Sequence, residues 1–196
     1  MPVHVVSKRR GSAWLTKNHP DALVLDVTSK GPSPWVRLSP FYPHGDIPVP
    51  FTPNTTGASV EGIWQALKVF EHADVDPTKL HVTTMTGLKR TVRRHGPVQG
   101  HRTGLEGTTL LQYEDARRRI YLPTYRWVLE TRAATEIATL RDLTAEQEVV
   151  LLDYTTNGDV TDLRTPLSHA ALVAQHLRSE TGFVEQPDHD RHGQGR

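Results

Sequence analysis

The chain has 196 residues, which is enough to bury one sizeable core, and the usual domain length favours a single domain. A formal net charge of +1 argues against a general polyanion-binding protein, because such binding needs many phosphate contacts from a strongly basic face. The chain has no apolar run near the roughly 20 residues that cross a bilayer, no hydrophobic segment of signal-peptide length at its start, and no cysteine. We therefore expect a cytoplasmic protein without disulfides, membrane contact or cysteine-ligated metal.

Short strands and loops are predicted for the first third of the chain. Residues 3–6 and 22–28 are rich in β-branched and aliphatic side chains and predict strands, while residues 8–21 between them are predicted to form a loop. Residues 31–57 contain seven of the fourteen prolines. Because proline cannot donate to a hydrogen-bonding ladder, we expect turns and short extended pieces there.

Helices dominate the prediction for the remaining chain. Ser59 is a plausible N-cap for a helix that ends near Phe70, and shorter helical segments are predicted at 77–80 and 84–96. Residues 108–143 have a helical pattern that Pro123 should break or kink. A strand at 148–154 and a helix at 165–180 complete a domain over residues 1–182. The polar residues 183–196 are predicted to be disordered.

One face of the helix predicted at 59–70 raises the first functional question. Gln65 and Lys68 lie within about 40° of Glu61 on a helical wheel, opposite the apolar residues. They can be a solvated face, which is the simpler interpretation. They can also line a pocket in which a desolvated Lys68 is a nucleophile towards a carbonyl carbon and Glu61 moves protons.

A basic segment at 89–102 has five Lys or Arg residues, two His residues and no acid. It can be a solvated surface or a phosphate site, and His101 and Arg102 add weight to the second interpretation because arginine offers forked donors for phosphate. The segment does not have the pattern of a Walker loop.

Polar residues follow the strand predicted at 148–154. Asp153, Asn157 and Asp159 can present oxygen atoms to a ligand at the end of a sheet, or can simply form an Asn- and Asp-rich turn. His169 can be a packed histidine or a site residue. The residues His189, Asp190, Arg191 and His192 include metal-ligand types, but we predict no metal site and no cofactor.

Three segments together resemble the NADAR family, the YbiA-like N-glycosidases. They are SPFYP at 39–43, SVEGIWQALKVF at 59–70 and VVLLDYTTNGDV at 149–160, and their order and spacing resemble the family over residues 36–180. The resemblance implies an α+β, largely helical fold with a few short strands.

The same resemblance implies cleavage of a bond between ribose C1 and a base or amine nitrogen, with a nucleotide or an ADP-ribosylated guanine as substrate. Lys68 matches the lysine that forms a Schiff base with the opened ribose, and Glu61 matches the acid that transfers protons. Further pocket residues are implied at Phe41, Tyr42, Trp64, Gln65, Asp153, Asn157 and Asp159, with His101 and Arg102 binding phosphate. A catalytically inactive nucleotide or ADP-ribose binding module and a nucleic-acid-binding protein remain the alternatives.

Overall fold

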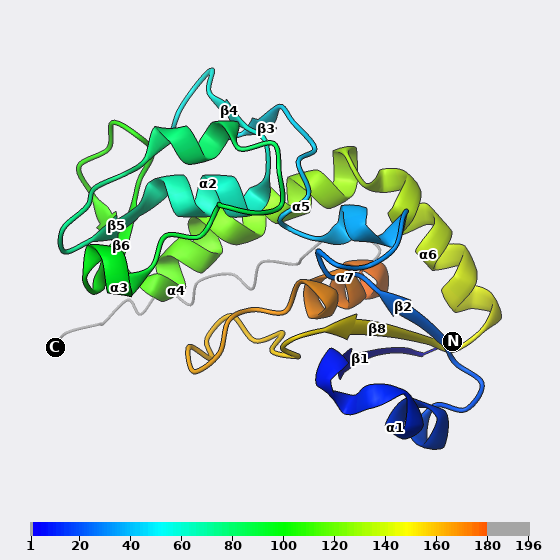
Figure 1. Ribbon diagram of the computed structural model, residues 1–196. Coiled ribbons are helices and arrows are strands. Elements are labelled where there is room, and N and C mark those ends of the chain that lie inside the picture. The colour runs from blue at the N-terminus through cyan, green and yellow to red at the C-terminus, as the bar shows by residue number, and fades with distance from the viewer. Residues whose placement is uncertain (1, 180–196) are drawn as a thin grey trace, which may run out of the picture.

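A parallel three-stranded sheet lies at the centre of one half of the molecule, in a computed structural model that describes residues 2–179 (Figure 1). Its strands are β1 (Val3–Ser7), β2 (Leu23–Asp26) and β8 (Val149–Asp153), in the order β1-β8-β2. β8 is central, and its first three residues are fully buried. A continuous apolar run suits a strand that is covered on both faces. The three strands predicted from sequence are confirmed, whereas the predicted disordered tail lies outside the described residues.

Helices cover this sheet. α1 (Gly11–Asn18) connects β1 to β2 after a short 3-10 turn, η1 (Lys8–Arg10), and α7 (His169–Arg178) follows β8 and packs against β1 and β8. In Figure 1, α1 and α7 lie on opposite sides of the sheet. The prediction of a loop at 8–21 is wrong, because this segment contains the helix α1. The sequence did not indicate the helix, since α1 has no buried residue and therefore no apolar periodicity.

α7 begins later than predicted. Ser168 is in the extended conformation, and its hydroxyl accepts the N–H of Ala171 at 3.1 Å. That N-cap starts the helix after Pro166 rather than at it.

The other half of the molecule is built around α2 (Val60–Leu67), whose eight residues are all buried. Around it lie η2 (Trp35–Leu38), η3 (Pro77–His81), the short ladder of β3 (Ile47–Pro48) with β4 (Thr56–Gly57), and α3 (Val92–His95). An antiparallel sheet follows in the order β5-β6-β7, with β5 (Lys68–Phe70), β6 (Val98–Arg102) and β7 (Leu110–Leu111). The helix predicted at 84–96 is reduced to the single turn α3.

α2 ends three residues earlier than predicted, so Lys68 is not on the helix. Lys68 has extended backbone angles (φ −73°, ψ 131°) and begins β5. The guanidinium of Arg90 donates to the carbonyl oxygens of Gln65 (3.2 Å) and Lys68 (2.6 Å), and the N–H of Asp76 donates to Ala66 O (2.8 Å). These donors satisfy the last carbonyl groups of α2 and let the chain leave the helix at Lys68.

A long helical stretch connects the two halves of the molecule. It contains α4 (Tyr113–Ala116), the π-helical segment η4 (Arg117–Tyr121) and α5 (Leu122–Thr131), and after a break at Arg132 and Ala133 it continues as α6 (Ala134–Glu146). Pro123 does not break the chain into two helices, because residues 113–131 are helical without a gap. The regular α-helical pattern is interrupted instead by the wider π-helical turns of η4, which end directly before α5 and accommodate the missing N–H of the proline.

The hydrophobic core unites both halves of the molecule, with members from the parallel sheet, α2, α5, α6 and α7. The fold is thus α+β, as predicted. Among the described residues, no helix is long and apolar enough to cross a membrane.

Candidate functional site

A pocket of about 470 Å³ opens between α2 and the carboxyl end of β8. Its lining comes from six parts of the chain: the residues after β2, the proline-rich loop, α2 with the start of β5, the segment before α3, the helical stretch α4 to η4, and the end of β8 with the residues up to the start of α7. The aromatic, charged and amide side chains of this lining include Phe41, Glu61, Trp64, Gln65, Lys68, Lys89, Arg90, Tyr113, Arg117, Tyr121, Asp153 and His169.

Glu61 is a buried carboxyl group in the first turn of α2. Its Oε1 accepts the Gln65 side-chain amide at 2.8 Å, and no described residue donates to Oε2. Gln65 is fixed in turn, because its Oε1 accepts the backbone N–H of Arg90 at 3.1 Å. Burial raises the pKa of Glu61, and the hydrogen bond from Gln65 and the charge of Lys68 offset this only partly. Glu61 is therefore suited to carry a proton.

Lys68 presents an unpaired amine to the same pocket. Its Nζ makes no hydrogen bond or ion pair with residues 2–179 and lies 5.8 Å from the ring centroid of Trp64. Burial lowers the pKa of Lys68; the charge of Glu61 opposes this shift, and the charges of Arg90 and Lys89 add to it. The shifts of Glu61 and Lys68 bring their two pKa values closer, so the neutral acid and neutral amine forms are both favoured. An uncharged amine is a nucleophile.

Aromatic rings form one wall of the pocket. Trp64 packs on His101 with ring centroids 3.7 Å apart and ring planes inclined by 32°, and it meets Tyr121 in a T-shaped contact with centroids 5.7 Å apart. Tyr113 completes this wall. A supported aromatic wall of this kind can hold the flat ring of a base.

Cationic groups are in excess over carboxylates in the pocket. Lys89 lies over Phe41, with its Nζ 5.5 Å from the ring centroid, and it has no hydrogen-bond or ion-pair partner among the described residues. Arg117 is 2% exposed and donates to three carbonyl oxygens of the loop that follows β8, those of Val160, Asp162 and Thr165. Arg117 is engaged by these oxygens, so of the two cations Lys89 is the one free to bind an anion.

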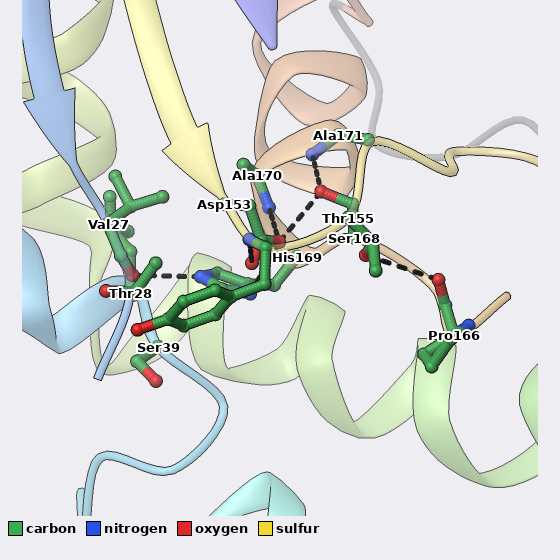
Figure 2. Close-up of polar contacts among 12 residues, drawn as sticks. Val27, Thr28, Ser39, Asp153, Thr155, Pro166, Ser168, His169, Ala170 and Ala171 are labelled. Carbon is green, nitrogen blue, oxygen red and sulfur yellow. Dashed lines mark hydrogen bonds and ion pairs between the residues drawn. The ribbon is translucent and has the colours of Figure 1, made fainter. Parts of the chain in front are cut away.

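Asp153 and His169 form an ion pair at the carboxyl end of β8, 3.0 Å apart (Figure 2). Asp153 Oδ2 also accepts the hydroxyl of Ser168 at 2.8 Å, while His169 Nε2 bonds to Val27 O at 2.9 Å. Burial alone raises the pKa of Asp153, but the hydrogen bonds and charge of His169 and the bond from Ser168 lower it overall. The ring of His169 is thus held between β8 and the residue that follows β2.

The structure brings together part of the site that the sequence predicted. The predicted residues that line the pocket are Phe41, Glu61, Trp64, Gln65, Lys68 and Asp153. The solvated-face interpretation of α2 is wrong, because Glu61 and Gln65 are 8% and 4% exposed.

Five predicted residues do not line the pocket. Tyr42 packs on His44, and Arg102 pairs with Asp74 on the surface at 2.9 Å. Asn157 donates to backbone oxygens within its own loop, Asp159 is exposed and caps Thr161, and His101 lies behind Trp64. Loop hydrogen bonding explains Asn157 and Asp159, as the turn interpretation allowed.

Several pocket residues were not predicted. Tyr113, Arg117 and Tyr121 enter from the helical stretch before Pro123, where no motif marks them. Lys89 and Arg90 belong to the basic segment at 89–102, but the phosphate interpretation named His101 and Arg102 at the other end of that segment. From the sequence, His169 could be either a packed histidine or a site residue.

Comparison with known families decides the classification of the chain. The profile of a family of unknown function, DUF6939, matches residues 7–173. The chain belongs to that family. No curated protein and no solved structure matches it.

The NADAR resemblance is therefore wrong, and the matched region of DUF6939 covers nearly all the residues that suggested it. The structure adds physical reasons. Lys68 lies on a strand and not on the helix of Glu61. Where NADAR proteins have histidine after the helix glutamate, this chain has Gly62, and a Cβ there would lie 2.7 Å from the backbone oxygen of Lys79.

Proposed function

We propose that this DUF6939 protein is a hydrolase that cleaves the N-glycosidic bond between ribose C1 and a base or amine nitrogen. The observation that carries the proposal is that Lys68 and Glu61 line the same pocket. Lys68 brings an amine of lowered pKa without a hydrogen-bond partner among the described residues, and Glu61 brings a buried carboxyl of raised pKa. This pairing supplies a nucleophile and a proton donor at the same place. The cytoplasmic location remains a prediction from the sequence.

The surroundings favour a nucleotide or ADP-ribosyl substrate. The wall of Trp64 and Tyr121 is suited to stacking a base, and the charged amine of Lys89 is suited to binding an anionic group. Asp153 lines the same pocket as an ionised acceptor, and it can take hydrogen bonds from ribose hydroxyl groups.

The reaction follows from these positions. Neutral Glu61 gives its proton to the leaving nitrogen as the C1–N bond breaks, and the neutral amine of Lys68 forms a bond to C1. The resulting ammonium group returns a proton to the Glu61 carboxylate. The C1–O4 bond then breaks, O4 takes a proton, and Lys68 and C1 share a Schiff base. Water adds to C1 and releases Lys68, so the net reaction is hydrolysis.

The test is mass spectrometry of the protein mixed with candidate substrates, with and without borohydride. The panel contains free ribonucleotides, ADP-ribosylated guanosine oligonucleotides and ribosylaminopyrimidine phosphates. Release of a base, with a reduced adduct on Lys68 that is absent from Lys68→Arg, is the expected result. Arginine keeps a long polar side chain at this position but has no nucleophilic amine at neutral pH.

Other outcomes favour the alternatives. Tight nucleotide binding without release, unchanged by Lys68→Ala, would replace the proposal with a catalytically inactive nucleotide or ADP-ribose binding module. Binding of unmodified nucleic acid that weakens steeply with salt and ignores Lys68 would indicate a nucleic-acid-binding protein.

A second measurement does not require the substrate. The lowered pKa of Lys68 predicts that its amine is reductively methylated at neutral pH faster than the exposed Lys17. Peptide mass spectrometry over a pH series measures both rates in the same sample. A slower reaction at Lys68 at every pH would remove the neutral amine from the mechanism.

A further inference from the structure

Two histidines and a glutamate meet at the amino-terminal edge of the parallel sheet, far from the pocket. His4 lies on β1, His19 follows α1, and Glu148 precedes β8. His19 Nδ1 lies 2.6 Å from Glu148 Oε1, and His4 Nε2 lies 3.3 Å from the same oxygen. One ligand atom from each residue falls within 4.8 Å of the other two.

The backbone holds these three residues in place. His4 pairs in register with Val150, two residues beyond Glu148. The carbonyl oxygen of Glu148 accepts the N–H of Leu23 at 2.9 Å, which joins it to the start of β2. The rings of His4 and His19 lie 4.9 Å apart. Strand pairing therefore brings the three side chains together, although they are distant in sequence.

We propose that His4, His19 and Glu148 bind a divalent transition-metal ion of the zinc class. Two imidazoles and one carboxylate are a common protein ligand set for such ions, whereas calcium and magnesium prefer oxygen atoms alone. Ligand atoms about 2.0–2.2 Å from a tetrahedral zinc ion are about 3.3 Å apart. The distance between His4 and Glu148 already matches this separation.

The hydrogen bond between His19 and Glu148 accounts for the shorter distance in this cluster. An ion bound by both atoms takes the place of this hydrogen bond, and the two ligand atoms then move apart by less than 1 Å to reach the tetrahedral separation. Three protein ligands leave a fourth position for water.

Accessibility suits an ion that exchanges with solvent. The side chains of His19, Glu148 and His4 are 13%, 33% and 41% exposed, so the cluster is neither sealed nor freely hydrated. His4 also lines a second hollow of about 340 Å³. In Figure 1 the three strands of the sheet begin at the right, near the label of the N-terminus, and run towards the left.

The site is separate from the proposed hydrolase pocket. Glu148 and Asp153 stand at opposite ends of β8, five residues apart, which corresponds to about 16 Å along a strand. A bound ion would join β1, β8 and the end of α1, so it would stabilise the fold by binding the native state only. The pocket residues would be untouched, and the two proposals can fail independently.

The test is calorimetric titration of the full chain with Zn²⁺, combined with thermal unfolding. The background is the double variant His189→Ala and His192→Ala, which removes the histidines near the carboxyl end of the sequence. We expect one Zn²⁺ per chain, a raised Tm with Zn²⁺, and no rise with Mg²⁺. Each of His4→Gln, His19→Gln and Glu148→Gln should weaken Zn²⁺ binding at least tenfold.

His72→Gln is the matched control, because His72 and Glu71 form an exposed pair 3.4 Å apart without a third ligand from the described residues. It should leave the affinity unchanged. If His19→Gln does not fold, the more exposed His4→Gln still decides the question. Absence of stoichiometric Zn²⁺ binding, or binding that all three substitutions leave intact, would overturn the proposal.

Discussion

Lys68 lies directly opposite His101 in the antiparallel ladder of β5 and β6, and His101 supports the ring of Trp64 from behind. His101 is 1% exposed, and neither ring nitrogen has a hydrogen-bond partner among the described residues. Burial and the charge of Lys68 lower the pKa of His101 to about 3, so the ring is neutral at physiological pH. A neutral neighbour adds no positive charge beside Lys68.

The first prediction concerns the support that the ring of His101 gives to Trp64. His101→Phe keeps the ring behind Trp64 and removes two buried polar atoms without partners, so the free energy of unfolding should change by less than about 1 kcal/mol. His101→Ala leaves a cavity and should cost about 2 kcal/mol or more. Urea unfolding at pH 7 measures both. A loss above about 3 kcal/mol for His101→Phe would mean that the ring nitrogens have partners.

The second prediction concerns the pH dependence of stability. Because the pKa of Glu61 is raised in the folded protein, the native state holds a proton that the unfolded state releases above its ordinary pKa. The contribution of Glu61 is thus fully present below about pH 4.5 and is lost as pH rises through the folded pKa. Glu61→Gln should remove this loss of stability with rising pH.

Urea unfolding of the wild type and Glu61→Gln from pH 4 to 8 gives the comparison. The variant should gain stability relative to the wild type as pH rises. Asp21→Asn, at an exposed position, is the matched control and should follow the wild type. A difference between wild type and Glu61→Gln that is constant with pH would show that the carboxyl is not desolvated.

The sequence predicted the three strands of the parallel sheet and the apolar face of α2, but neither the burial of Glu61 and Gln65 nor the position of Lys68. Ile63 and Leu67 recur at helical spacing, and so does Phe70, which made a longer helix plausible. The helix ends because Arg90, distant in sequence, donates to its last carbonyl oxygens. The pocket residues of η4 and the cluster at His4 also depend on such long-range contacts, which periodicity does not record.

The third prediction concerns the packing of α2 at Gly62. A Cβ at this position would lie 2.7 Å from the backbone oxygen of Lys79 and 3.0 Å from Ser59 Oγ, so Gly62→Ala forces α2 away from η3. We expect a loss of about 1–3 kcal/mol. Gly158→Ala is the comparison, because its Cβ would meet the flexible end of Gln175 at 2.8 Å, and it should cost less.

Thermal unfolding of the two alanine variants checks this order. Equal stability of Gly62→Ala and the wild type would mean that α2 and η3 are not in close contact. The result also bears on the classification, since a contact that excludes any side chain at Gly62 separates this chain from proteins with histidine there.

The fourth prediction concerns the ion pair of Asp153 and His169. Asp153→Asn removes the carboxylate that lies 3.0 Å from the ring of His169 and weakens the bond to Ser168 at the N-cap of α7. Breaking a buried pair from one side costs about 3–5 kcal/mol, and we expect a loss in that range. Asp21→Asn again serves as the exposed control.

The pH dependence gives this prediction a sign. The pKa of Asp153 is lowered in the folded protein, so its contribution is present above the unfolded value near 3.8 and is lost as pH falls through the folded value. The difference in free energy of unfolding between the wild type and Asp153→Asn should therefore shrink on the acid side of pH 4. A difference that stays constant down to pH 2 would show that the carboxylate is not stabilised by His169 and Ser168. In that case Asp153 would also lose its role as the ionised acceptor in the proposed reaction.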